Sequence, residues 1–122
     1  MTENTDYSEP KMAKFVDALI RATANERVNW NQVGTGPDSF QVSFPRNSAM
    51  VWSIDDDGQH PFRLALFDAN GQTLESIETY RNSAEDQPPL FAKIGELYAA
   101  ARKQVRNIDA ILDGILEDLG DS

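Results

Sequence analysis

The chain has 122 residues, 40% hydrophobic and 25% charged, with 20 acidic against 11 basic residues and a formal net charge of -9. This length suits one domain, and the apolar content is too high for a disordered chain. The negative charge repels phosphate backbones and anionic lipid, which argues against nucleic-acid and membrane partners. Cysteine is absent, so disulfides, thiolate zinc sites and cysteine nucleophiles are excluded.

The N-terminal part predicts a flexible terminus over residues 1–7, followed by a single α+β domain over residues 8–122. The start has no basic region and no apolar run, so we expect a cytoplasmic protein. Ser8 is a candidate helix cap, and Pro10 suits a first helical turn. An apolar stripe at helical spacing then predicts a helix that fades near Ala24. Its members are Met12, Phe15, Val16, Leu19 and Ile20.

Residues 28–80 alternate with a period of two, which predicts an antiparallel sheet. Asp68-Ala69-Asn70-Gly71 is typical of a tight hairpin turn. Leu74 and Ile77 are three positions apart, so strict alternation would put them on opposite faces of the strand. We therefore expect a bulge or an exposed leucine. The predicted strands are 40–44, 49–54, 62–67 and 74–80, with Val28-Asn29-Trp30 as a candidate short first strand.

The last third of the chain carries the longest periodic signal, with apolar residues every three or four positions from Leu90 to Leu119. This predicts one long helix. The alternative is a break near Asn107, because Asn107 suits a helix cap and Gly114 costs about 1 kcal/mol in a helix interior. Thirty helical residues span about 45 Å and a six-residue strand about 20 Å, so an unbroken helix overhangs its sheet.

The overhanging part of this helix is still apolar and needs cover. Either the helix breaks and folds back onto the domain, or a second chain packs there as a helical dimer. Basic residues up to Arg106 precede acidic ones from Asp109, so the helix is also electrically polarised. The predicted interaction surface consists of Arg102, Arg106, Ile108, Ile111, Leu112, Ile115, Leu116 and Leu119.

Three short motifs suggest chemistry, and each has a structural explanation. The acidic turns 55–58 and 68–71 offer the oxygen ligands that calcium prefers, but the later positions of an EF-hand loop are missing. His60 is the only imidazole, and its position before Pro61 favours a solvent-exposed loop histidine. The glycine-rich stretch 34–37 lacks the Lys-Ser/Thr of a phosphate loop. We therefore expect no catalytic residue, no cofactor and no metal site.

The order of features resembles that of small uncharacterised bacterial proteins over about residues 15 to 119. A tryptophan follows the first helix, an Asp-x-Asn-Gly hairpin lies in the sheet, and the last helix carries a characteristic series of residues. That series comprises Leu97-Tyr98, Ala101-Arg102, Asp109, Leu112 and Ile115-Leu116. The resemblance implies an α-β-α order and nothing about activity.

We expect an α+β fold with an N-terminal helix, an antiparallel β-meander of three to five strands and a long C-terminal helix, both helices on one sheet face. The expected function is a non-enzymatic protein-interaction module, regulatory, immunity-type or inhibitory, that acts through its acidic surface or its last helix. Its partner is another protein or, as a homodimer, a second copy. The alternative is a small-ligand-binding domain whose pocket is lined by Trp30, Trp52, Phe62 and Tyr98.

Overall fold

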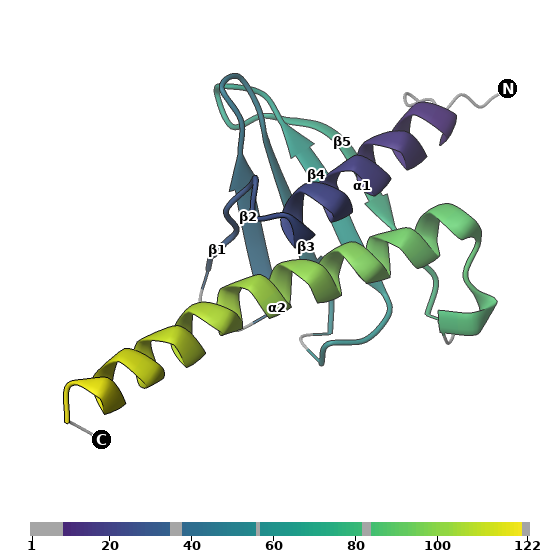
Figure 1. Cartoon of the computed structure of the whole chain (residues 1–122). Coiled ribbons are helices and arrows are strands. Elements are labelled where there is room, and N and C mark those ends of the chain that lie inside the picture. The colour runs from purple at the N-terminus through teal and green to yellow at the C-terminus, as the bar shows by residue number, and fades with distance from the viewer. Residues whose placement is uncertain (1–8, 35–37, 56, 82–83, 121–122) are drawn as a thin grey trace, which may run out of the picture.

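The computed structural model describes residues 9–34, 38–55, 57–81 and 84–120, and it has the predicted α+β architecture. Helix α1 (Glu9–Ala24) precedes five strands, and helix α2 (Pro89–Asp118) follows them after a short 3-10 turn, η1 (Ala84–Asp86). Both helices lie on one face of the sheet, as predicted (Figure 1). The predicted flexible terminus, the Ser8 cap and loop positions 35–37 lie outside the described residues.

The strands form one antiparallel meander in the order β1-β2-β3-β4-β5. The prediction of Val28-Asn29-Trp30 as the first strand is wrong, because the backbone N–H of Trp30 donates to Gln104 Oε1 on α2, at 2.7 Å, instead of to a neighbouring strand. The strands are β1 (Asn31–Gln32), β2 (Ser39–Ser43), β3 (Ser48–Ser53), β4 (Phe62–Phe67) and β5 (Thr73–Glu78).

The turn between β4 and β5 is the predicted hairpin. Asp68 Oδ1 accepts the backbone N–H groups of Asn70 and Gln72, both at 2.9 Å, and Gly71 has a φ of 83°, which favours glycine. Beyond the turn, Leu66 pairs with Glu75 and Phe67 with Thr73. Leu74 is therefore the extra residue of a bulge and is 55% exposed. This confirms the expectation drawn from the parity of the apolar residues.

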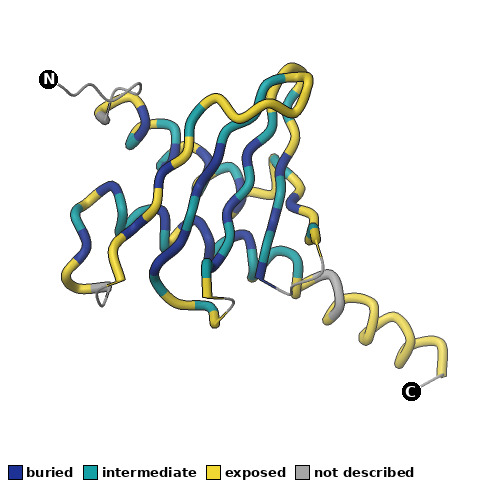
Figure 2. Tube along the Cα trace, turned by 180° about the vertical axis from the view of Figure 1, so that it is seen from behind, coloured by how far each residue is buried: buried dark blue, intermediate teal, exposed yellow. Residues whose placement is uncertain are grey.

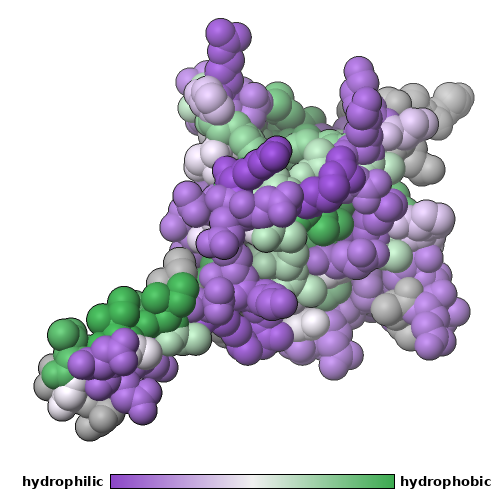
Figure 3. Space-filling view, in the orientation of Figure 1, coloured by the Kyte–Doolittle hydropathy of each residue, from purple (hydrophilic) through white to green (hydrophobic). Residues whose placement is uncertain are grey.

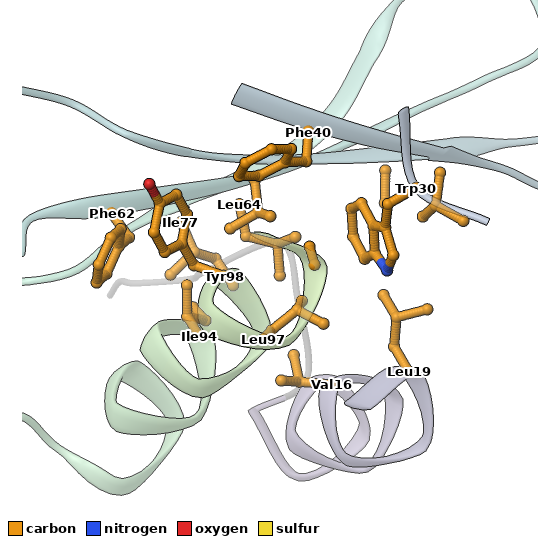
Figure 4. Packing of buried hydrophobic residues seen from close by; sticks show 14 of the residues in the cluster. Val16, Leu19, Trp30, Phe40, Phe62, Leu64, Ile77, Ile94, Leu97 and Tyr98 are labelled. Carbon is orange, nitrogen blue, oxygen red and sulfur yellow. The ribbon is translucent and has the colours of Figure 1, made fainter. Parts of the chain in front are cut away.

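The core lies between the inner face of the sheet and the two helices (Figure 4). Along β2 and β3, alternate residues are buried beneath the helices, which is the arrangement that a period of two produces. The apolar stripes of α1 and α2 face the same space and close it from the other side. The buried set includes Val16, Leu19, Trp30, Phe40, Val42, Val51, Leu64, Ile77, Ile94 and Leu97.

Both described helices lie on the inner face of the sheet, and neither covers its outer face. Met50, Trp52 and Arg63 project there from β3 and β4, opposite in parity to the buried Val51 and Leu64, and they are only partly buried. The Arg63 guanidinium lies 6.0 Å from the centre of the Trp52 ring, within the range of a cation–π contact. Trp52 is therefore separated from the core by the sheet itself.

Helix α2 runs unbroken through 30 residues, so the alternative of a break near Asn107 is wrong. Pro89 occupies the first turn, where its missing N–H costs nothing. Asn107 and Gly114 are isolated within segments of good helix formers, and a propensity cost of about 1 kcal/mol at Gly114 does not end a helix that is anchored in the core. Among the residues described, no helix has the length and apolarity needed to cross a membrane.

Truncation of a core residue tests this packing. Ile94 is fully buried, so we expect Ile94→Ala to lower the free energy of unfolding by about 2–5 kcal/mol. The control is Leu74→Ala at the exposed bulge, which should change it by less than about 0.5 kcal/mol. Urea unfolding followed by tryptophan fluorescence measures both. Equal losses in the two variants would contradict this assignment of the core.

Candidate functional site at the projecting end of α2

The second half of α2 projects beyond the domain. Val105 is the last residue of the helix that packs against the core. From Arg106 onward, every helix side chain that the structure describes is exposed (Figure 2). The helix is long because its sequence keeps a helical repeat, whereas the five strands have at most six residues each and are too short to cover it.

The exposed end of the helix carries five large apolar side chains, here called the terminal stripe: Ile111, Leu112, Ile115, Leu116 and Leu119. Their exposed fractions are 55%, 50%, 48%, 45% and 70%, respectively. Figure 3 shows them as a continuous apolar patch at the end of α2. Apolar patches of this kind on a folded protein mark interaction surfaces more often than scattered exposed residues do.

The terminal stripe continues the face of α2 that forms the core. Leu90, Ile94, Leu97 and Ala101 are buried at spacings of three and four, and the same repeat runs on to Leu119. The structure therefore groups five of the eight predicted surface residues on one face. The side chain of Ile108, which the repeat also includes, lies outside the described side chains.

The two predicted basic residues lie beside the terminal stripe and not within it. A turn of 3.6 residues places Arg102 and Arg106 on the flank of α2 that also carries Asp113. There, they line a hollow of about 490 Å³ together with Lys103, Phe62 and Tyr98. Arg102 Nε lies 3.8 Å from Asp38 Oδ1. The sequence grouped these arginines with the stripe by their proximity in the chain, and the helix turn separates them.

A second hollow, of about 510 Å³, lies where α2 leaves the domain, and we call it the basal hollow. The end of α1, the segment around Trp30 and one side of α2 enclose it, and Ile111 belongs to both the hollow and the terminal stripe. Sequence reasoning missed it, although Gln104 gave a signal as a polar residue within the apolar repeat. Its lining includes Thr23, Trp30, Gln104, Asn107 and Ile111.

Hydrogen bonds fix the wall of the basal hollow. Gln104 accepts the backbone N–H of Trp30 and donates to Val28 O at 2.8 Å. The Trp30 indole Nε1 donates to Thr23 Oγ1 at 2.9 Å, and this hydroxyl donates to Leu19 O at 2.7 Å. Buried polar groups that are satisfied in this way set a unique packing geometry. The angle at which α2 leaves the domain is therefore fixed by α1 and the Trp30 segment together.

The four aromatic residues expected to line one ligand pocket do not come together. Phe62 and Tyr98 line the hollow beside the arginines, with their rings stacked 4.5 Å apart. Trp30 lines the basal hollow. Trp52 lies on the outer face of the sheet. The sequence could not separate these positions, because strand pairing and helix packing decide which face each ring occupies.

His60 is half-buried, so the prediction of a solvent-exposed histidine is wrong. Its Nδ1 lies 2.7 Å from Thr79 Oγ1, and its ring meets the edge of the Phe62 ring at 4.6 Å between centres. Burial lowers the pKa of His60. The lack of a side chain at Gly95 makes room for it, since a Cβ there would lie 3.0 Å from His60 Nε2. These contacts give His60 a structural role.

The acidic turn after β3 is held by ordinary polar contacts. Asp55 Oδ2 accepts from Arg81 Nη1 at 2.6 Å, and Asp57 Oδ1 accepts from the Ser53 hydroxyl at 3.1 Å. Asp56 lies outside the described residues. In the part of the chain that the structure describes, no three potential ligands of the His, Cys, Asp or Glu type gather into a metal site.

Comparison of this chain with protein families, with curated proteins and with solved structures finds no significant match. The site is therefore interpreted from its own geometry.

The hydrogen bond between Tyr98 and Asp38 makes stability depend on pH. The Tyr98 hydroxyl donates to Asp38 Oδ1 at 2.6 Å, and burial, followed by this hydrogen bond and the Asp38 charge, raises the pKa of Tyr98 well above its ordinary value. The folded state thus favours the neutral phenol. The contribution of Tyr98 to the free energy of unfolding is complete below a pH of about 10, which is the pKa of tyrosine in the unfolded chain. It is lost as the pH rises above that value.

We expect Tyr98→Phe to lower the free energy of unfolding by about 1–3 kcal/mol at neutral pH, because buried Asp38 loses its hydrogen-bond donor. The difference between wild type and variant should shrink from about pH 10 upward. Urea unfolding at a series of pH values measures it. A difference that stays constant up to about pH 11 would show that Tyr98 titrates alike in both states.

Proposed function

We propose that this protein is a non-enzymatic interaction module, of a regulatory, immunity or inhibitor kind, and that its docking surface is the terminal stripe. The observation that carries the proposal is the row of five apolar side chains, each about half exposed or more, at the end of a helix that the domain covers only in its first half. Burying apolar surface contributes about 25 cal/mol per Å², so a protein that covers this row gains a large part of its binding energy there.

The geometry also favours binding with little reorganisation. The helix is already formed, its first half is anchored in the core, and the hydrogen bonds of Gln104 and Trp30 fix its direction. A preformed helix binds more tightly than one that has to fold on binding, because less conformational entropy is lost. Recognition of an apolar helix face is a common mode of protein association.

His60 is engaged by Thr79 and Phe62, which supports a structural rather than a catalytic role for the only imidazole. A cytoplasmic location belongs to the proposal as well, and fractionation of cells that express a tagged chain tests it.

Affinity capture tests the docking surface. Wild type and Ile115→Asn serve as baits in extracts of the source cells, and captured proteins are quantified by mass spectrometry. We expect at least one protein to be recovered with wild type and reduced by about tenfold with Ile115→Asn, which corresponds to about 1.4 kcal/mol. Asparagine is used because it leaves the net charge unchanged.

The matched control is Leu74→Asn, which changes an apolar side chain on β5 that is 55% exposed, against 48% for Ile115. This variant should capture the same proteins as wild type. Recovery of an identical set with all three baits would contradict a docking role for the terminal stripe. Urea unfolding of each bait checks that the substitutions leave the fold intact, since exposed substitutions change stability by less than about 0.5 kcal/mol.

A further inference from the structure

The projecting segment is strongly acidic as well as apolar. From residue 107 to residue 118 the sequence contains Asp109, Asp113, Glu117 and Asp118 and no lysine or arginine. Asp113, Glu117 and Asp118 are exposed. With 3.6 residues per turn, Asp113 and Asp118 flank the terminal stripe on its two sides. The apolar row is therefore bordered by negative charge.

The basal hollow extends this surface onto the domain. Ile111 joins the hollow to the stripe, and Trp30 and Gln104 form its wall. One acidic residue, Glu26, and one basic residue, Lys103, also line it, so the hollow itself is close to neutral. Specific complexes involve about 20–30 residues on each side, more than the tip of one helix supplies. A partner that covers the stripe must therefore reach the hollow as well, where a large apolar side chain has about 510 Å³ of space.

The shape of the surface fits a helix. From Ile111 to Leu119 the stripe follows one helix face for about 12 Å, at 1.5 Å per residue. A second helix whose own apolar side chains repeat at three and four positions meets such a row over its whole length. Positive side chains on both borders of that second helix would lie beside Asp113 on one side and Asp118 on the other.

We propose that the occupant of this surface is a cationic amphipathic helix of another protein, with its apolar face on the terminal stripe and the basal hollow and with lysine or arginine on its borders. This inference rests on the proposed function and specifies the chemistry of its partner. Apolar burial supplies most of the affinity, because exposed ion pairs contribute little. The charges select the partner and accelerate association.

Charge also disfavours a second copy of the chain. Two projecting segments that lie parallel bring two groups of carboxylates together. An antiparallel copy sets its acidic end beside Arg102, Lys103 and Arg106, but the two chains still repel each other through a net charge of -9 each. Like charges across a helical interface weaken the pairing. A cationic helix converts the same carboxylates into favourable neighbours.

Binding of synthetic helices to the full chain tests the proposal. The probe is a fluorescent peptide of about 18 residues, or five turns, with leucines at helical spacing and lysines on both borders. Its counterpart has glutamates in place of the lysines. We expect anisotropy titrations to show binding of the lysine peptide and at least about tenfold weaker binding of the glutamate peptide. Raising the ionic strength from about 0.01 M to about 0.15 M should weaken the lysine complex, because the Debye length falls from about 30 Å to about 8 Å.

Variants of the chain separate the contribution of apolar burial from that of charge. Ile115→Asn should weaken binding of the lysine peptide by about tenfold, whereas Leu74→Asn should leave it unchanged. A double variant with Asp113→Asn and Asp118→Asn keeps the apolar stripe, and it should weaken the lysine peptide several-fold and reduce its salt dependence. Equal binding of the two peptides, or equal effects of Ile115→Asn and Leu74→Asn, would overturn the proposal.

Sedimentation of the chain alone tests whether a second copy of the chain, instead of a cationic helix, covers the terminal stripe. A dimer that Ile115→Asn disperses would mean that a second copy covers the stripe, and would overturn the cationic partner. If both peptides fail while Ile115→Asn still abolishes capture from extracts, only the chemistry of the partner is wrong. If the capture also fails to depend on Ile115, the proposed function falls with it.

Discussion

Helix α2 presents one apolar stripe along 30 residues, whereas α1 and the sheet cover only the part of it that ends near Val105. The buried part supplies Leu90, Ile94 and Leu97 to the core, so the helix cannot turn its apolar face elsewhere without losing that packing. Because a helix is rigid over this length, the orientation set in the core also sets the orientation of the projecting end. The exposed terminal stripe is therefore a direct result of how the core is built.

The polar contacts at the base of the projection support the same geometry. Gln104 accepts the backbone N–H of Trp30 and donates to the carbonyl of Val28. Farther along the contact between the helices, Lys93 Nζ donates to Asp17 Oδ1 at 2.7 Å. Tyr98 ties the opposite side of α2 to Asp38. These bonds connect the helix to α1, to the segment before β1 and to the start of β2. They leave it little freedom to pivot, which suits a helix that serves as a docking surface.

Electrostatics and apolar surface act together at the projecting end. Arg102 and Arg106 line the Tyr98 hollow, on the flank of α2 that also carries Asp113. Arg106 precedes Asp113 by about 10 Å along the helix axis, so the carboxylates from Asp113 onward lie beyond the basic residues. An apolar row with an acidic border discriminates among partners more strongly than an apolar row alone, since a partner of the wrong sign is repelled. The overall charge of -9 adds to this selection at longer range.

The local pattern of residues was sufficient for the two helices and the four longer strands, but not for the two-residue strand β1. The alternation of Phe40, Val42 and Phe44, the Asp68–Gly71 turn and the helical repeat from Leu90 to Leu119 depend on neighbours in the chain, and the structure confirms them. The terminal stripe was predictable too, because a thirty-residue helix is longer than any strand that packs against it. These features depend on the repeat of helices and strands over neighbouring residues, so a single sequence is enough to predict them.

Long-range contacts decided the rest. No sequence pattern states that Trp52 lies behind the sheet, that Trp30 meets Gln104, 74 positions away, or that His60 packs beside Gly95. Distant contacts also formed the hollow that Arg102 and Arg106 line, since Gly58 and Phe62 meet α2 there. Whether the helix broke near Asn107 was open as well. A propensity cost of about 1 kcal/mol at Gly114 is small enough for packing of the helix in the core to override it. The sequence alone determined the periodicities, and only the packed structure decided which faces meet, because burial depends on residues far apart in the chain.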